Sequence, residues 1–254
     1  MLPIALGEAT KTVPYIMDGH KTYRFTVAWG TETSTDDLEG EAVETSDARP
    51  DEASIREVMA NYRGEIEQVP PAFSAVKING ERAYKLARAG EEVEIEPRTV
   101  AIHRLELVEV ENSDRAVFEC ECGKGTYVRA LARDMGRDLG CFGHVADLRR
   151  TGVGPFGEDD LVPLDELVAL EGDLDGLDAE LLPVGLALEE LPEVQVSPPQ
   201  ASRLRAGNAV LLRGPDALTF ADEAYATMGE ELIAIGTVEQ GSFNPRRVFK
   251  VSAA

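Results

Sequence analysis

Apolar and polar side chains alternate along residues 21–29, and the apolar set falls on one face: Tyr23, Phe25, Val27 and Trp29. A period of two predicts a half-buried β-strand. Two further strands are expected over 99–110 and 115–122, joined by the polar turn between them. A polar, acidic loop is expected to follow the first strand, from Gly30 to about Asp47.

Helical spacing replaces alternation in other segments. Residues 51–63 carry apolar side chains three and four positions apart, which predicts an amphipathic helix. Residues 126–139 show the same spacing, and Gly140 follows their end. Shorter elements are expected in this order: a strand over 74–78, a turn at Asn79-Gly80, a helix over 81–89, and a helix over 164–171.

The pattern changes near residue 192. Residues 172–191 are acidic and rich in leucine, and they predict a connector that contains helix. Beyond it, turns separate short strand-like runs at 194–196, 208–213, 231–238 and 246–251. We therefore expect an α+β protein with two domains, residues 1–190 and a small all-β domain of residues 191–254.

Composition narrows the class of protein. The chain has 254 residues, of which 43% are hydrophobic, enough for a buried core. No apolar run approaches the ~20 residues needed to span a bilayer, and no secretory signal is evident. A cytoplasmic location is the expectation.

The chain has three cysteines, a low and odd number that fits a reducing compartment. Cys120 and Cys122 share a strand face, and Cys141 forms a C-x-x-H pattern with His144. A zinc site could be drawn from these four residues, but structural zinc pairs usually have wider spacing. Buried thiols are the alternative. A metal enzyme is disfavoured, because the sequence has neither H-E-x-x-H nor paired C-x-x-C.

Charge is distributed unevenly. The formal net charge is −22, which taken alone argues against a nucleic-acid partner. Residues 31–67 and 157–191 each hold 12 acidic side chains, whereas the basic residues concentrate in 69–90 and 124–150. Two interpretations stay open: a chance variation between solvated faces, or a local anion-binding surface on an acidic protein.

Two segments could carry chemistry. The junction Gly123–Arg129 brings glycines and an arginine to a helix start, a place that favours anions, although its spacing is not that of a P-loop. A plain glycine-rich turn is the alternative. Residues 69–90 interleave Phe73 and Tyr84 with four cations, which suits RNA. A third block, 143–150, has a histidine but no legible catalytic triad.

These blocks, taken together and in order, closely resemble the TruB family, the bacterial tRNA pseudouridine-55 synthases. The motif P-P-x-F-S-A-x-K-x-x-G-x-x-x-Y-x-x-A-R-x-G spans 70–90, and K-G-T-Y-V-R spans 124–129. The start M-L-P-I-A-L-G-E-A-T-K and the tail from Val194 to Val251 also match, so the resemblance covers nearly the whole chain. It implies a mixed, mainly antiparallel sheet of the pseudouridine synthase type with flanking helices, plus a C-terminal PUA-like domain that binds RNA.

The resemblance also implies roles. Tyr23 matches the tyrosine that packs against the target base, Arg129 the arginine that pairs with the catalytic aspartate, and Leu148 an apolar wall of the pocket. Charge alone suggests the following contacts to RNA phosphates: Lys77, Lys85, Arg88, Lys124, Arg149 and Arg150. The implied reaction isomerises uridine 55 in the T loop of tRNA by flipping the base and forming a C-glycoside. The family uses no cofactor and no metal, and we expect a monomer that binds the tRNA T stem-loop.

The chain departs from the family pattern at its start. The family's nucleophilic aspartate lies in G-H-T-G-x-L-D-P-x-A-x-G, immediately before the M-L-P-I block with which this chain begins. Asp18 lies in a different setting and is not a substitute. We therefore expect the nucleophile upstream of Met1. A misassigned start or a cut chain explains its absence better than a shortened gene. The 254-residue chain is then expected to lack synthase activity.

Two other functions stay open. A non-catalytic tRNA-binding or RNA-folding protein would retain tRNA on a filter without forming pseudouridine. An acidic metabolic enzyme would show no salt-sensitive tRNA binding.

Overall fold

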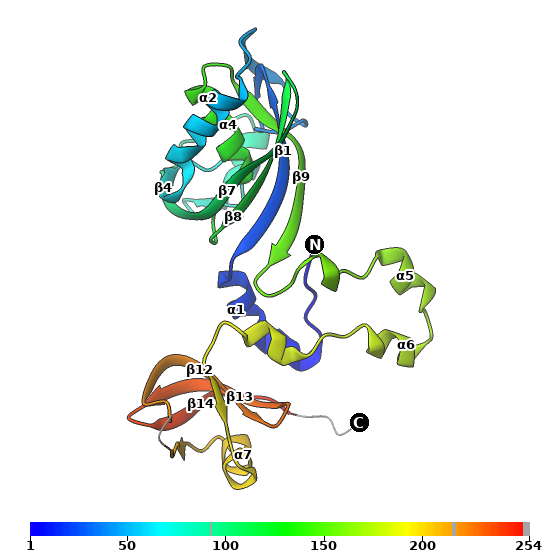
Figure 1. Cartoon of the computed structure of the whole chain (residues 1–254), viewed down its shortest axis with the longest axis vertical. Helices are drawn as coiled ribbons and strands as arrows, with labels where there is room; N and C mark the ends of the chain where they lie inside the picture. Colours follow the sequence, from blue (N-terminus) through cyan, green and yellow to red (C-terminus); the bar gives the residue numbers. More distant parts are fainter. Residues whose placement is uncertain (92, 215–216, 251–254) are drawn as a thin grey trace. The chain divides into compact units, whose positions relative to one another are not determined.

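The computed structural model describes residues 1–91, 93–214 and 217–250, and it divides into two compact units (Figure 1). The first unit comprises Met1 and residues 18–153, and the second comprises residues 2–17 and 154–254. By packing, therefore, the first residues of the chain group with its C-terminal part. The domain boundary expected at 190/191 stays a prediction.

A five-stranded antiparallel sheet forms the first unit, in the order β4-β7-β8-β1-β9. Its strands are β1 (Lys21–Trp29), β4 (Gly64–Gln68), β7 (Arg98–Asn112), β8 (Arg115–Cys122) and β9 (Gly143–Val153). Alternation predicted β1, β7 and β8 correctly, whereas β4 and β9 were not predicted as strands. The sheet matches the fold that the resemblance implied.

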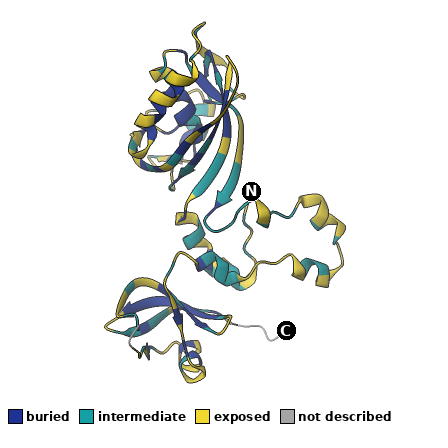
Figure 2. Cartoon of the chain, in the orientation of Figure 1, coloured by how far each residue is buried: buried dark blue, intermediate teal, exposed yellow. Residues whose placement is uncertain are grey.

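One face of this sheet is the core face. Phe25 and Phe118 are opposite each other in the β1–β8 register, and their rings stack with centroids 5.3 Å apart. Phe25 is buried together with Val27 and Trp29, as the alternation predicted. The buried band along these strands is visible in Figure 2.

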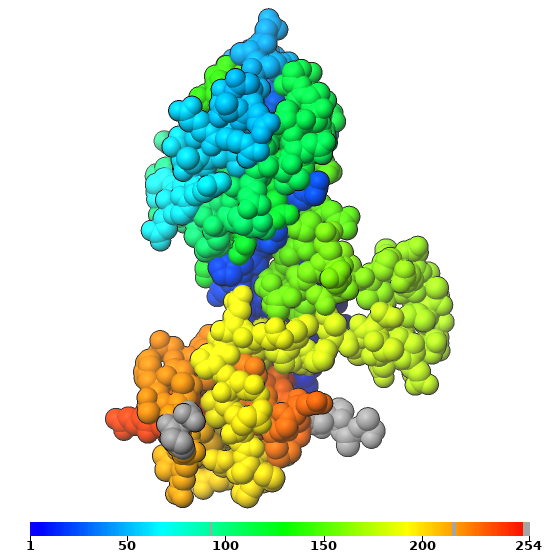
Figure 3. Space-filling view, in the orientation of Figure 1, coloured from blue at the N-terminus to red at the C-terminus, as the bar shows by residue number. Residues whose placement is uncertain are grey.

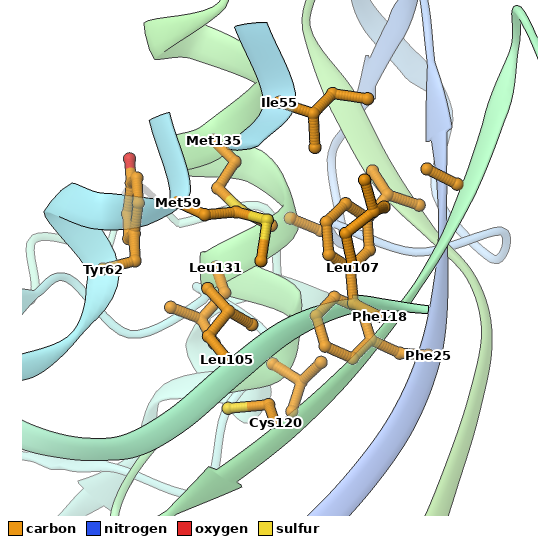
Figure 4. Close-up of a cluster of buried hydrophobic side chains, with 14 of the residues drawn as sticks. Phe25, Ile55, Met59, Tyr62, Leu105, Leu107, Phe118, Cys120, Leu131 and Met135 are labelled. Atoms are coloured by element: carbon orange, nitrogen blue, oxygen red, sulfur yellow. The ribbon is translucent and has the colours of Figure 1, made fainter. Parts of the chain in front are cut away.

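Two helices cover the core face, α2 (Glu52–Met59) and α4 (Val128–Asp138). Asp51 caps α2 by accepting a hydrogen bond from the Ser54 N–H at 2.8 Å. The two helices contribute Ile55, Met59, Leu131 and Met135 to the same cluster, and Tyr62 joins it from the short 3-10 helix η2 (Ala60–Tyr62) that follows α2 (Figure 4). Burial of apolar area in this cluster is the main force that holds α4 against the sheet.

The expected loop after β1 contains a small hairpin, β2 (Thr31–Thr33) and β3 (Ala42–Thr45). The 69–90 segment contains β5 (Lys77–Ile78), β6 (Glu81–Arg82) and α3 (Ala83–Arg88). The strand is thus shorter than the predicted 74–78, and the helix begins two residues later than predicted. The turn at Asn79-Gly80 is confirmed, since both residues have positive φ (50° and 91°), as a tight hairpin turn requires.

The second unit contains a sheet in the order β10-β12-β13-β14-β11. Its strands are β10 (Glu193–Gln195), β11 (Val210–Leu211), β12 (Phe220–Met228), β13 (Glu231–Glu239) and β14 (Ser242–Val248). Sequence analysis missed β12 and the helix α7 (Pro198–Arg205), and its 246–251 run ends outside the described residues. A β domain with one helix therefore replaces the purely β module.

The remaining elements of this unit are short. They are η1 (Gly7–Thr12), α1 (Val13–Asp18, whose last residue belongs to the first unit), η3 (Glu158–Asp160), α5 (Leu164–Ala169), α6 (Leu174–Ala179) and η4 (Val184–Leu188). Lys11 joins the chain ends by donating to the Val248 carbonyl at 2.7 Å. Leu164, Val168 and Leu174 remain 62–77% exposed on α5 and α6, the yellow-green segment of Figure 3.

Candidate active site

Arg129 lies in the first turn of α4 and binds two separate loops. Its Nη1 donates to Asp37 Oδ2 at 2.8 Å and to the Thr35 carbonyl at 3.1 Å. Its Nη2 donates to the Phe73 carbonyl at 2.9 Å. The side chain is 24% exposed, so the guanidinium is accessible from one side. The arginine that the resemblance selected is therefore the centre of a hydrogen-bonded site.

Asp37 is the carboxylate partner of Arg129, and its local contacts hold it in place. Its Oδ1 accepts hydrogen bonds from Thr35 Oγ1 at 2.5 Å and from the Glu39 N–H at 3.0 Å. Burial alone would raise the pKa of Asp37, but these hydrogen bonds and the Arg129 guanidinium outweigh it and lower the pKa. Asp37 is thus held ionised.

The local sequence explains why α4 begins where it does. Gly125 has φ +86°, a conformation that glycine adopts without strain. Gln68 fixes the next residues, because its Oε1 accepts from the Tyr127 N–H at 2.8 Å and its Nε2 donates to the Tyr127 carbonyl at 3.2 Å. The glycine-rich junction therefore works as a helix start that aims Arg129 toward the acidic loop.

Tyr23 and Leu148 lie on neighbouring strands of the same sheet. Tyr23 is opposite Arg150 in the β1–β9 register, and Leu148 is opposite the core residue Phe25. Burial raises the pKa of Tyr23, so its phenol stays neutral at ordinary pH. Leu148 is 44% exposed, unlike the core residue opposite it. An exposed leucine on the face that α4 covers fits a pocket wall better than a core position.

Three of the predicted phosphate contacts lie on the 69–90 segment. Lys77, Lys85 and Arg88 are all exposed. The Arg88 guanidinium lies 5.5 Å from the centroid of the Tyr84 ring, a cation–π contact. Lys85, Arg88 and Tyr84 thus lie together on α3, while Lys77 lies on β5.

The other three predicted contacts are distributed over β9 and the helix start. Lys124 forms an ion pair with Asp18 at 2.7 Å, with both side chains largely exposed. Arg150 donates to the Met1 carbonyl at 2.9 Å, and Arg149 is exposed and opposite Arg24 across the β1–β9 register. Because Arg149 alternates with Leu148 and Arg150, it occupies the other face of the sheet.

The structure adds charged residues that sequence analysis passed over. Besides Arg129–Asp37, α4 forms Arg133–Asp36 at 3.1 Å and Arg137–Glu32 at 2.6 Å. The sequence holds one half of this signal, since three arginines at four-residue spacing occupy one helix face, but it does not identify their acidic partners. A cavity of about 330 Å³ borders this row and is lined by Arg133, Asp134 and Arg137, with an apolar floor that includes Val69 and Ile95.

The three cysteines are buried. Cys120 and Cys122 both belong to the main core cluster, which confirms that they share a strand face. Within the part of the chain that the structure describes, no cluster of three or more His, Cys, Asp or Glu side chains could hold a metal ion. No helix in this part is long and apolar enough to cross a membrane.

The antiparallel sheet, the two covering helices and the separate C-terminal sheet define a pseudouridine synthase fold. The chain is similar in fold to a chain of the Cbf5 complex with Nop10 and Gar1, with TM-score 0.71 and 25% identity over 99% of this chain and 72% of that chain. An H/ACA ribonucleoprotein bound to a substrate RNA matches in fold with TM-score 0.72 at 21% identity, over 97% of this chain and 71% of that one.

The chain belongs to the TruB family of pseudouridylate synthases. The model of the family's N-terminal domain matches residues 1–128, and that of the tRNA pseudouridylate synthase B C-terminal domain matches residues 129–189. The tRNA pseudouridine synthase B of Agrobacterium fabrum is 60% identical over 98% of this chain and 81% of its own length. That of Rhizobium meliloti is 61% identical over 98% and 82%.

The comparisons confirm the family that the motifs indicated. They give no support to the expectation that the chain is inactive, nor to the alternative of a non-catalytic RNA-binding protein. They leave the roles of Tyr23, Arg129, Leu148 and the six cations as predictions.

Proposed function

We propose that this protein is a tRNA pseudouridine synthase that isomerises uridine 55 in the T loop. One observation carries the proposal. Arg129, the last residue of the family-like K-G-T-Y-V-R motif, donates from Nη1 to Oδ2 of the partly buried Asp37 at 2.8 Å. Its relatives named tRNA pseudouridine synthase B, at about 60% identity, support the same substrate. The enzyme acts as a monomer in the cytoplasm.

The reaction is an isomerisation, so the composition of the nucleotide is unchanged. The N1–C1′ glycosidic bond breaks, the uracil turns, C5 bonds to C1′, and the C5 proton leaves while N1 gains one. The target base is first flipped out of its stack into a pocket. The protein's task is to orient a carboxylate nucleophile and the detached base, with neither cofactor nor metal.

Arg129 is suited to orient that carboxylate. A guanidinium has five N–H donors, and the bonds to Asp37, Thr35 and Phe73 use three of them. The other two, on Nε and Nη2, form the fork that binds a carboxylate and keeps it ionised. Asp37 offsets part of the arginine's charge, so the site can hold two carboxylates around one guanidinium.

Tyr23 and Leu148 form the walls that receive the base. The neutral phenol ring of Tyr23 offers a flat surface for stacking, and Leu148 supplies an exposed apolar contact beside it. The two walls exclude water from the place where the glycosidic bond breaks, and the lower local dielectric strengthens the electrostatic effect of Arg129.

The test is pseudouridine formation at a single position of a tRNA transcript. The protein is incubated with an unmodified tRNA transcript, and the nucleotide at position 55 is assayed. We expect pseudouridine at this position. Absence of pseudouridine, although tRNA is retained on a filter, would favour the RNA-binding alternative.

A second test addresses the phosphate contacts. Replacing Lys85 and Arg88 together by alanine should weaken tRNA binding and flatten its salt dependence by about two charges, because each phosphate contact releases about one counterion. Glu81→Gln is the matched control on the same segment, since it removes an exposed negative charge. An unchanged salt slope in the double variant would exclude these two residues from the interface.

A further inference from the structure

Helix α4 carries a ladder of three ion pairs along one face. Arg129, Arg133 and Arg137 are four residues apart, so their side chains lie one above another. The partners all come from residues 31–40: Asp37 pairs with Arg129, Asp36 with Arg133, and Glu32 with Arg137. The catalytic candidate Arg129 forms the rung at the start of α4, and the other two rungs are not explained by the reaction.

The middle rung is the most deeply buried of the three. The side chains of Asp36 and Arg133 are each 8% exposed, compared with 23–24% for Asp37 and Arg129. Removing two charges from water usually costs as much as their attraction returns, so such a pair is weak evidence for stability. A role in holding a particular arrangement explains its presence better.

The backbone at Asp36 supports this role. Asp36 has φ +60°, a left-handed conformation that costs about 1–2 kcal/mol in a residue with a side chain. The strain is held by two hydrogen bonds, from the Asp36 N–H to the Thr33 carbonyl at 3.1 Å and from the Val145 N–H to the Asp36 carbonyl at 3.0 Å. The left-handed turn sends two adjacent carboxylates, Asp36 and Asp37, to two adjacent rungs.

Arg133 also reaches the loop on the other side of Arg129. Its Nη2 donates to the Val69 carbonyl at 2.8 Å, just as Arg129 Nη2 donates to the Phe73 carbonyl at 2.9 Å. The middle rung therefore fixes both loops that contact Arg129: residues 31–40 through Asp36 and residues 69–73 through Val69. A shift of either loop would move a hydrogen-bond partner of Arg129.

We propose that Asp36 and Arg133 are positioning residues, which hold the two loops so that the Arg129–Asp37 pair keeps the orientation the reaction needs. The inference rests on the proposed function. The part of α4 that supports the reaction then reaches one full turn beyond Arg129, the last residue of the family motif.

The test is the Asp36→Asn variant of the protein. Asparagine adopts left-handed φ readily and keeps the shape of the side chain, so only the charge is lost. We expect kcat for pseudouridine formation to fall about tenfold, with KM for tRNA changed less than twofold. Asp134→Asn is the matched control: Asp134 also pairs with Arg133, at 2.7 Å, but belongs to α4 and not to either loop.

A measurement independent of activity uses hydrogen exchange of backbone amides. In Asp36→Asn the amides of residues 31–40 and 69–73 should exchange faster than in the parent, while those of α2 stay unchanged. If Asp36→Asn does not fold, Arg133→Met tests the pair from the helix side with the same expectations, and a double variant should be no worse than the poorer single one.

The outcomes separate the two proposals. An active parent with kcat for Asp36→Asn within twofold of it overturns the positioning role and leaves the proposed function intact. A parent that makes no pseudouridine contradicts the proposed function, and hydrogen exchange then decides alone whether the pair holds both loops. Equal losses in Asp36→Asn and Asp134→Asn also overturn the inference, because they would reflect the charge near Arg133 and not the loop.

Discussion

Two acidic segments of this chain have similar composition and opposite structural roles. In residues 31–40, Glu32 and Asp36 are buried, Asp37 is partly buried, and each pairs with an arginine of α4. In residues 157–191, all acidic side chains except Asp160 are exposed. The same carboxylates thus build a site in one segment and a solvated surface in the other.

The difference comes from what faces each segment. The 31–40 loop lies against a helix whose arginines recur every fourth residue, and its conformation is held by the parallel bridge between Asp37 and Val145. In 157–191, the carboxylates serve local ends, such as Asp173, which caps α6 by accepting from the Gly176 N–H at 3.0 Å. The number of acidic residues in a segment therefore does not predict whether they form ion pairs. The regular spacing of arginines on the facing helix is the better indicator.

Removing Arg129 from the 31–40 site should have the largest effect on activity. Arg129→Ala leaves Asp37 without its cation and both loops without their shared donor, and we expect kcat to fall by about 10³-fold, the scale for losing one preorganised charged group. Arg129→Lys keeps the charge but not the fork, and should recover only a small part. Steady-state kinetics on tRNA transcripts measure both. Near-parent activity in Arg129→Ala would remove Arg129 from the site.

The buried carboxylate Asp36 should give the 31–40 segment a pH dependence. Burial raises the pKa of Asp36 from 3.8 to about 6, although Arg133 and Arg137 oppose the shift and Glu32 and Asp134 add to it. Between these two pH values the folded state binds the proton and the unfolded state does not, so this group favours folding as pH falls and opposes it above pH 6.

The stability of Asp36→Asn relative to the parent should accordingly rise as pH increases from 4 to 8, by at most about 3 kcal/mol, since one pKa unit corresponds to about 1.4 kcal/mol. Most of this change should occur around pH 4 to 6, where the parent gains the charge that the variant lacks. Thermal unfolding across this range measures it, with Asp165→Asn as the exposed control. A gap between Asp36→Asn and parent that stays constant with pH would contradict the raised pKa.

The Arg137–Glu32 rung, nearest the end of α4, should give a smaller effect. Arg137 donates to both carboxylate oxygens of Glu32, at 2.6 and 2.7 Å, but Arg137 is itself half exposed. Glu32→Gln should therefore lower the free energy of unfolding by about 1–2 kcal/mol. Glu39→Gln, at an exposed position of the same loop, is the control and should change little. Denaturant unfolding compares the two, and equal losses would show that the ion pair adds nothing specific.

Neutralising the exposed segment should have the smallest effect. Asp165→Asn together with Glu166→Gln should change the free energy of unfolding by less than about 0.5 kcal/mol, because both side chains are exposed on α5. A larger loss in denaturant unfolding would show that 157–191 is more than a solvated surface.

The core of the first unit could be predicted because it depends on local periodicity. Alternation predicted β1 with its bounds and its buried face, and helical spacing predicted the apolar face of α4. The ladder could not be predicted in the same way, because its partners are about 95 residues apart in sequence and meet only through the fold. A loop that reads as polar in sequence gives no sign that its carboxylates turn inward.

Some of the elements that were not predicted do have a signal in the sequence. Helix α7 has Ser197 at its cap, Pro198 at its first position, and a hydrogen bond from the Ser197 N–H to Gln200 Oε1 at 2.9 Å. This is the capping-box pattern, written in the sequence as S-P-P-Q. Strand β9 was obscured because burial does not alternate along it and its pairing with β1 has two register shifts. Such a strand shows no period of two in its sequence.

The grouping of residues 2–17 with residues 154–254 has a consequence for synthesis on the ribosome. The residues of the first unit have all been made once residue 153 is reached, and they can pack together while the rest is still being made. Lys11 must wait for its partner carbonyl at Val248, which is made about 100 residues and about 5–20 s later at ordinary elongation rates. Residues 2–17 are therefore made early but reach their native contacts late.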